Sequence, residues 1–298
     1  MRRRDVLATL ASGAGVLAGC STRTRPVSEA TPEPEPTPPP DVTTITGTKP
    51  LPAPDGASSR EAARSFVEAY ERRYVYNELV DGFGGSQPAI EVTVEPARVA
   101  PVHATDRGYY FLSACRGSAR YYDPDGSPSG GSRNASSVAH FVGPDTHRRI
   151  PFNAYRCEEP VLAPSNEAAE ERRTARFQLY DFETPPDYDR PERGGQAVEV
   201  TVTDGEGATV LDSTYRTSLP LTVQPRVTAT PGAYTLSASL ADGASARHDW
   251  SLSTPVGPSW WALALLVTNG GEPVVRTLYP NGAVGLPSGT VCRSLDEG

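Results

Sequence analysis

The second half of the chain consists of short runs in which apolar and polar residues alternate, and this pattern limits the fold more than any other feature. Valine alternates with Glu or Thr over residues 198–203, and an apolar residue occupies every second position of 234–240. Gly-containing turns at 204–207 and 242–243 join each run to a following one. A period of two puts alternate side chains on one sheet face, and such turns close hairpins. We therefore predict an all-β sandwich.

A motif in this region resembles the tyrosine corner of immunoglobulin-like sandwiches. Residues 231–236 read Pro-Gly-Ala-Tyr-Thr-Leu, and in that family the tyrosine hydroxyl ties the chain back across one end of a sheet. A cysteine often follows two residues after this tyrosine in the family, whereas this chain has Leu236. The resemblance implies an immunoglobulin-like domain of the disulfide-free fibronectin III or cadherin type. We assign it to residues 173–298, where a C-terminal hairpin from residue 258 either completes the sandwich or packs on the preceding domain.

Helical spacing marks the start of that preceding domain. Ser58 and Glu61 form a capping-box pair, and apolar residues then recur every three or four positions up to Leu79, with charged residues such as Glu71 on other faces. Strand-like runs follow at 90–94, 98–103, 108–115, 120–122, 138–142 and 149–157. This order indicates an α+β domain at 56–160, with one amphipathic helix on an antiparallel sheet. A polar connector at 158–173 separates it from the sandwich.

The first 20 residues have the parts of an export signal. Three arginines at 2–4 precede a weakly apolar run, 6–19, which is too short to span a bilayer. The Arg-Arg-Asp-Val-Leu start resembles a twin-arginine leader, and Leu-Ala-Gly-Cys at 17–20 resembles the lipobox of exported lipoproteins. The resemblance implies cleavage before Cys20 and lipid attachment to its thiol. We therefore expect a protein held by this lipid at the extracellular face of the cytoplasmic membrane.

Residues 21–55 are dominated by Pro, Thr and Glu, and no apolar residue recurs in them with a period. Proline removes backbone donors, and a segment of this composition cannot bury enough apolar surface to fold. We predict a disordered stalk. In polyproline II conformation, at about 3.1 Å per residue, it would reach on the order of 100 Å.

The charge of the chain excludes one class of partner. The formal net charge is −8, and it becomes more negative when the leader, with its three arginines and one aspartate, is removed. Nucleic-acid binding needs a basic face, so we do not expect it. Lys49 is the only lysine. Acidic, lysine-poor, arginine-rich exported chains resemble secreted proteins of salt-loving archaea, in which excess carboxylates keep a protein soluble at high salt.

Three cysteines remain if Cys20 carries a lipid. Cys115 and Cys157 both end strand-like runs of the predicted α+β domain, and a disulfide between them would contribute roughly 4 kcal/mol in the chain-entropy account. Pairing of Cys157 with Cys292 is the alternative. No two cysteines are spaced two to four residues apart, so we do not expect a zinc site.

Candidate chemical groups in the first domain have no motif spacing. His103, His140 and His147 could converge on a metal, but neither His-Glu-x-x-His nor Gly-x-Ser-x-Gly occurs. We therefore expect no cofactor and no metal. Asp123 and Asp125 have the alternate-oxygen spacing of calcium loops, but the downstream glutamate is missing and the Asp-Gly pair favours a plain turn.

Two features suggest contact with glycans. Asn134-Ala-Ser is an N-glycosylation acceptor in a predicted loop. Trp260 and Trp261 could form a sugar-stacking platform, although their apolar neighbours favour a core role.

These observations predict a lipid-anchored surface protein that acts by binding or structural display and is not an enzyme. Its partners would be the membrane, through the lipid, and a cell-surface protein or glycan. The alternative is an extracellular metal- or glycan-dependent hydrolase with its site in residues 56–160.

Overall fold

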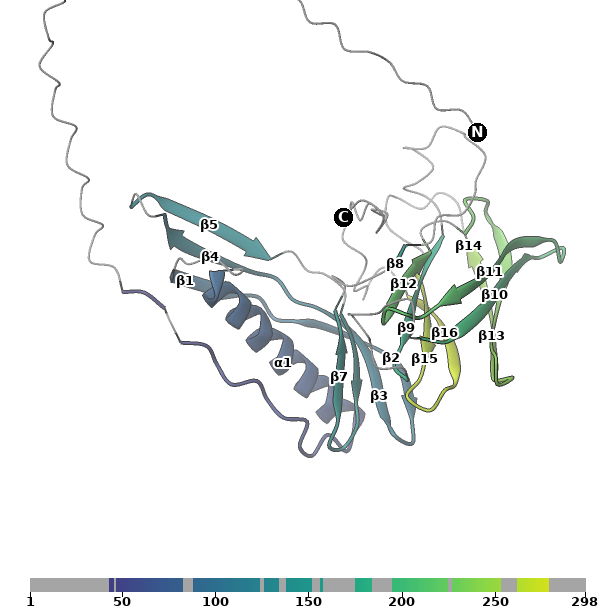
Figure 1. Ribbon diagram of the computed structural model, residues 1–298, viewed down its shortest axis with the longest axis horizontal. Coiled ribbons are helices and arrows are strands. Elements are labelled where there is room, and N and C mark those ends of the chain that lie inside the picture. Colours follow the sequence, from purple (N-terminus) through teal and green to yellow (C-terminus); the bar gives the residue numbers. More distant parts are fainter. Residues whose placement is uncertain are drawn as a thin grey trace, which may run out of the picture. The chain divides into compact units, whose positions relative to one another are not determined.

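The computed structural model describes one α-helix and sixteen β-strands within residues 43–45, 47–82, 88–123, 126–133, 138–151, 156–157, 175–183, 195–224, 227–252 and 262–278 (Figure 1). The chain divides into two compact units, Met1–Pro38 and Pro39–Gly298, and all of the described residues belong to the second unit. In chain order the elements are α1 (Arg60–Val80), β1 (Ala89–Val94), β2 (Arg98–Thr105), β3 (Gly108–Ala114), β4 (Gly117–Tyr122), β5 (Pro128–Arg133), β6 (Val138–Val142), β7 (His147–Ile150), β8 (Arg156–Cys157), β9 (Arg176–Asp181), β10 (Ala197–Asp204), β11 (Thr209–Arg216), β12 (Leu221–Gln224), β13 (Gly232–Leu240), β14 (Ser245–Leu252), β15 (Ala262–Val267) and β16 (Pro273–Leu278).

Helix α1 begins where the sequence supplies a cap. The Ser59 hydroxyl accepts a hydrogen bond from the Ala62 amide at 3.2 Å, so the capping residue is one position later than the predicted Ser58. No helix among the described residues is long and apolar enough to cross a membrane.

One side of α1 packs on strands β1, β3 and β4 (Figure 1). Near the end of the helix, Val75 and Leu79 share a buried cluster with Tyr121 of β4, whose hydroxyl donates to the Leu79 carbonyl at 2.7 Å. Gly117 permits this approach, since a Cβ at that position would lie 2.6 Å from Leu79 Cδ1. The close contact therefore depends on the absence of a side chain at residue 117.

The strands form four sheets. Their orders are β1-β4-β5, β2-β3-β6-β7, β16-β15-β9-β12-β8 and β11-β10-β13-β14. Neighbouring strands run antiparallel except for the pairs β15–β9 and β12–β8, which are parallel. The predicted hairpin turns at 204–207 and 242–243 join β10 to β11 and β13 to β14, as the alternation indicated. The turn at 269–271 likewise joins β15 to β16, with Gly271 at φ 78°.

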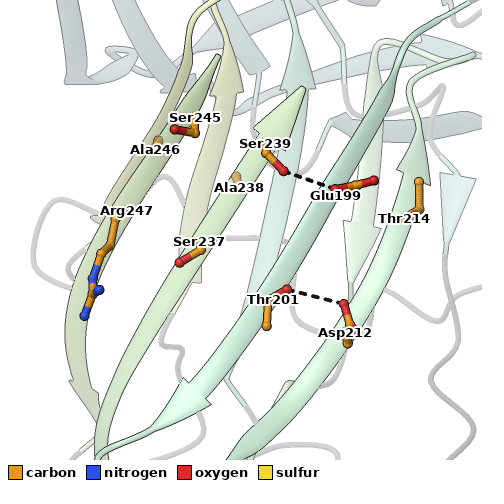
Figure 2. Close-up of a pocket in the computed structure, with 10 residues that line it drawn as sticks. All are labelled: Glu199, Thr201, Asp212, Thr214, Ser237, Ala238, Ser239, Ser245, Ala246 and Arg247. Atoms are coloured by element: carbon orange, nitrogen blue, oxygen red, sulfur yellow. Dashed lines mark hydrogen bonds between the residues drawn. The ribbon is translucent and has the colours of Figure 1, made fainter. Parts of the chain in front are cut away.

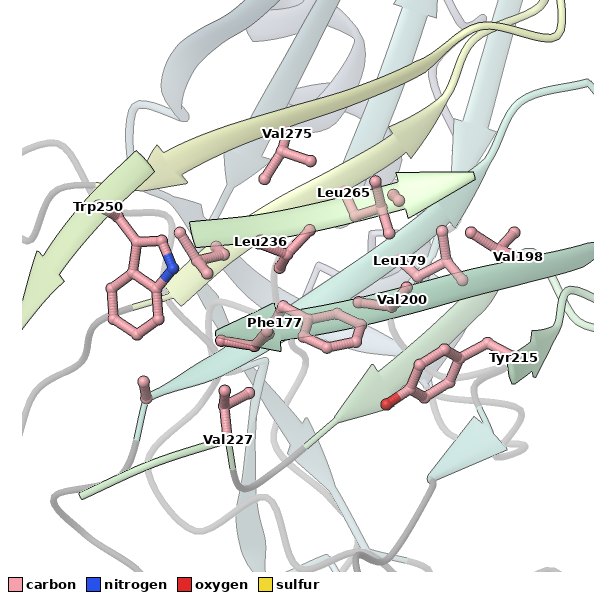
Figure 3. Close-up of a cluster of buried hydrophobic side chains, with 14 of the residues drawn as sticks. Phe177, Leu179, Val198, Val200, Tyr215, Val227, Leu236, Trp250, Leu265 and Val275 are labelled. Atoms are coloured by element: carbon pink, nitrogen blue, oxygen red, sulfur yellow. The ribbon is translucent and has the colours of Figure 1, made fainter. Parts of the chain in front are cut away.

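The last two sheets enclose one apolar core, so the predicted sandwich is confirmed (Figure 3). Val198, Val200 and Val202 are buried, and the residues between them point outward, as the period of two predicted. The rest of the core is drawn from both sheets and includes Phe177, Leu179, Tyr215, Leu236, Trp250, Leu265 and Val275. The C-terminal hairpin β15–β16 completes the sandwich, because β15 pairs with β9 in its second sheet.

The sheet β16-β15-β9-β12-β8 is apolar on both faces. Its other face shares a core with β3, β6 and β7, built from Tyr110, Leu112, Phe141, Ile150, Tyr180, Phe182, Leu221, Val223 and Leu266. Polar contacts tie the same parts together. The Tyr110 hydroxyl donates to Asn269 Oδ1 at 2.6 Å and accepts from the Asn269 amide at 3.0 Å, and Arg107 Nη1 donates to the Asn269 carbonyl at 3.1 Å. The first and second halves of the described chain therefore share buried surface.

Two segments differ from the sequence-based expectation. The predicted run at 149–157 divides, because β7 joins β6 whereas β8 pairs with β12 of the sandwich. Residues 43–45 and 47–55 belong to the predicted stalk, but they make contacts with the fold. Ile45 forms a bridge with Ala89 of β1, and Lys49 and Pro50 form hydrogen bonds with α1. The predicted leader at 1–20 and the connector at 158–173 lie outside the described residues.

Candidate functional site

Five polar side chains meet under helix α1, and we call them the His–Glu–Arg cluster: Glu71, Ser113, His140, His147 and Arg149. His140 is at the centre, with Nε2 2.8 Å from Ser113 Oγ and Nδ1 3.0 Å from His147 Nε2. Arg149 donates from Nε to Glu71 Oε1 at 2.7 Å and from Nη2 to Oε2 at 3.3 Å. Glu71 Oε1 also lies 3.6 Å from His140 Nε2. The cluster thus links α1 to β3, β6 and β7.

Aromatic rings close the cluster from the side of α1. The Arg149 guanidinium lies 3.8 Å from the centre of the Tyr74 ring. His147 packs edge-on against Phe66 and Tyr70, at centroid distances of 4.9 and 4.4 Å. A cation over an aromatic face is favourable, and more so when it is withdrawn from water.

The prediction that Glu71 lies on an outer face of α1 was wrong. We had placed it with the charged residues on the outer faces of α1, but it is 1% exposed. Its burial is tolerated because Arg149 supplies two hydrogen bonds and a compensating charge. Its spacing was the available signal, because Val67 and Val75 lie four residues to either side of it on the buried face.

The surroundings keep both histidines neutral. Burial, followed by the charge of Arg149, lowers the pKa of His147 to about 4. Burial, with smaller effects of His147 and Arg149, lowers the pKa of His140 well below its usual value of 6.5. For Arg149, burial alone would lower the pKa, but the hydrogen bond and charge of Glu71 outweigh it and raise the pKa. At neutral pH the cluster therefore contains two uncharged imidazoles beside the Glu71–Arg149 ion pair.

A serine beside a neutral histidine is the first requirement of a nucleophilic site. Ser113 and His140 meet it in distance, but both are 0% exposed and Glu71 is 1% exposed, so a substrate has no route to the serine. The geometry is that of an interior polar network that fixes α1 on the strands beneath it.

The three histidines considered as metal ligands do not converge. His140 and His147 are in contact, whereas His103 lies elsewhere, with Nδ1 3.3 Å from Arg276 Nη2. Within the described ranges, no group of three or more His, Cys, Asp or Glu side chains is arranged to hold a metal ion. The positive charge of Arg149 also opposes a cation beside His147.

Cys115 is a buried, free thiol, so the disulfide that we predicted with Cys157 is not part of this structure. Its sulfur lies 3.5 Å from the Glu95 carbonyl, and burial raises the pKa of the thiol to about 12. The backbone of Cys157 lies in β8, paired with Val223 of β12 in a different sheet from the strands that flank Cys115. The pairing failed as a prediction because we had placed residue 157 in the sheet of the first domain.

The possible calcium loop forms a turn in the part that the structure describes. The Asp123 amide donates to the Ser127 carbonyl at 2.8 Å, the Gly126 amide donates to the Asp123 carbonyl at 2.8 Å, and Gly126 has φ 81°. This is the geometry of a tight connection between β4 and β5. Asp125 lies outside the described residues, as do Cys20, Asn134, Trp260, Trp261 and Cys292.

An open groove of about 670 Å³ lies on the outer face of the sheet β11-β10-β13-β14 (Figure 2). Hydroxyl groups and two carboxylates line it, and cross-strand hydrogen bonds hold both carboxylates in place. Ser239 donates to Glu199 at 3.3 Å, and Thr201 donates to Asp212 at 3.3 Å. Sequence analysis identified these residues only as the outward half of an alternating pattern. The arrangement can form hydrogen bonds with a polar partner.

The predicted tyrosine corner is present. The Tyr234 hydroxyl donates to the Thr230 carbonyl at 2.5 Å, four residues upstream, and its ring stacks on Trp250 at a centroid distance of 4.8 Å. Leu236, where the family often has a cysteine, is fully buried in the sandwich core. Apolar packing of Leu236 therefore occupies the position at which related domains often have a disulfide.

Comparison with known families agrees with this geometry. Residues 195–282 match the family model of the halobacterial Ig-like domain. The match begins after β9, although β9 lies in the middle of one of the two sheets. No curated protein and no solved structure matched the chain. The C-terminal part of the chain therefore contains an Ig-like domain similar to those of halobacteria.

Proposed function

We propose that this protein is an exported, lipid-anchored surface protein whose Ig-like domain serves as a binding or structural display module. The observation that carries the proposal is the match of residues 195–282 to a halobacterial Ig-like domain, together with the tyrosine corner at Tyr234. Domains of this architecture are common at cell surfaces, where their loops and sheet faces meet partners.

The location rests on the sequence of the first 20 residues. Arginines at 2–4, a short apolar run and Cys20 at its end support export by the twin-arginine route and lipid attachment. The net charge of −8 and the single lysine support a protein that works in high salt, outside the cell.

We propose that residues 56–160 form an α+β layer that supports the Ig-like domain. Support comes from the packing of α1 on β1, β3 and β4 and from the apolar core that β3, β6 and β7 share with the sandwich. Burial of the Ser113–His140 pair supports a structural role for this layer over a hydrolytic one.

We propose a cell-surface protein or a glycan as the partner. The residues of the groove in Figure 2 offer hydroxyl, carboxylate and guanidinium groups at exposed positions, which suits polar recognition at a water-filled interface. A partner of this kind would be bound by hydrogen bonds and would be released by substitutions that fill the groove.

Photo-crosslinking on intact cells tests the proposal. A photoreactive residue replaces Ser237 in the groove, and a second variant carries it at Ser132 of β5 as the matched control. We expect a cross-linked surface product from the Ser237 position that is absent when Arg3 and Arg4 are replaced by Lys, because that leader should not be exported. Products confined to the cytoplasm, or an equal yield from the two positions, would contradict the proposal.

A further inference from the structure

Residues 43–45 and 47–57 precede helix α1 in the chain, and the later part of this segment runs beside the helix (Figure 1). We call residues 43–45 and 47–57 the strap. The central contact is between Lys49 and Asn77. The Lys49 amide donates to Asn77 Oδ1 at 2.8 Å, and Asn77 Nδ2 donates to the Lys49 carbonyl at 2.8 Å. One side chain thereby satisfies both backbone groups of one strap residue, as a neighbouring strand would.

Two further contacts extend this pair along α1. Arg73, one turn before Asn77, donates from Nη1 to the Pro50 carbonyl at 2.8 Å. The Lys49 ammonium lies 3.7 Å from the centre of the Tyr76 ring. Proline at residue 50 has no amide to leave unpaired, so the backbone groups of residues 49 and 50 are all satisfied at this contact.

Both ends of the strap are fixed as well. At its start, the Ile45 amide donates to the Ala89 carbonyl at 2.6 Å in an antiparallel bridge on the edge strand β1. At its end, a turn with Gly56 at φ 77° leads to Ala57, which is buried in a cluster with Phe66. The strap therefore pairs with the edge strand β1 at Ala89 and enters α1 from a packed position.

We infer that the strap is a clamp that joins the membrane tether to the fold, an inference that rests on the proposed lipid anchor. Among the described residues, the chain first contacts the fold at Ile45, beside Ala89, and not at the first turn of α1. A pull on the anchor then loads the Ile45–Ala89 bridge first and the Lys49–Asn77 pair next. The predicted stalk would then comprise residues 21–42, and a segment of that length in polyproline II conformation would reach about 70 Å.

Hydrogen exchange on the full chain, purified in detergent, tests the clamp. We expect slow exchange of the Ile45 and Lys49 amides in the unmodified protein. Asn77→Ala should speed exchange at Lys49 about tenfold, because it removes both hydrogen bonds together. Arg64→Ala, at an exposed arginine of the same helix, is the matched control and should leave the strap unchanged. Slow exchange in β3 of each variant shows that the fold is intact.

Exchange of the strap at the rate of an unstructured peptide would overturn the inference, as would an Asn77→Ala variant whose Lys49 amide is still protected. The same measurement on the Cys20→Ser chain separates the two proposals. If the Cys20→Ser chain stays in the membrane and its strap is protected from exchange, the result would support the clamp and contradict the lipid anchor. A protected strap in a chain that is released supports both.

Discussion

The pair of Glu71 and Arg149 gives a quantitative test of the interior network. Their side chains are 2% and 10% exposed, and two hydrogen bonds join them. Removing one partner of such a pair leaves a buried charge without compensation, which costs about 3 to 5 kcal/mol. We therefore expect Glu71→Gln to lower the free energy of unfolding by about this amount. For a protein with a total stability of about 5 to 15 kcal/mol, the loss is large.

The double variant distinguishes a paired charge from simple loss of packing. Replacing Arg149 by Met together with Glu71→Gln removes both charges, so the double variant should lie within about 2 kcal/mol of the original protein. Urea titration followed by circular dichroism at the helix signal and by tryptophan fluorescence gives the free energies. Because the two halves share a core, we expect both signals to change in one transition. A cost below about 1 kcal/mol for Glu71→Gln, or strict additivity in the double variant, would refute this account.

Three further predictions follow from single residues. The free energy of unfolding should fall between pH 6.5 and 4, because His140 and His147 of the unfolded chain take up protons there while the folded ones do not, and His147 alone should account for up to about 3 kcal/mol of this fall. His147→Phe should flatten this part of a pH series of urea titrations, and an unchanged slope would count against it. Cys115 should react with a thiol reagent only on unfolding, read by peptide mass mapping, whereas fast labelling of the native protein would show that it is accessible. Tyr234→Phe should cost about 1 kcal/mol of thermal or urea stability by leaving the Thr230 carbonyl unpaired, and a silent substitution would contradict the role of the corner.

The sandwich was predictable because its information is local. Val198, Val200 and Val202 alternate with polar residues, and the turn residues between strands select hairpins without help from the rest of the chain. The tyrosine corner is equally local, since Tyr234 and Thr230 lie four residues apart. The predicted alternation therefore fixed the inner and outer faces of this sheet correctly.

The polar network could not be predicted because its members are distant in sequence. Arg149 reaches Glu71 across 78 residues, and only the folded chain shows that a charge on the apolar side of α1 has a partner.

The run at 262–267 had a similar ambiguity. A strand buried on both faces reads as a continuous apolar segment, so its contact with two cores at once has no periodic signature.

The strap was misjudged for a different reason. Its proline content predicts a chain without its own secondary structure, and that expectation says nothing of hydrogen bonds supplied from outside. Asn77 and Arg73 supply them from α1, and their side chains alone give no sign in the sequence that a peptide lies across them.

The lipid on Cys20 is the central claim, and the fate of the Cys20→Ser protein tests it most directly. Cells that produce the full chain, the Cys20→Ser variant or Cys292→Ser as a matched control are separated into membrane, soluble and medium fractions, and the intact mass is measured in each. The account predicts that the original and control proteins stay with the membrane and carry the added mass of a lipid. The Cys20→Ser protein should appear in the medium or remain unprocessed. Membrane retention and mass that do not depend on residue 20 would contradict the account.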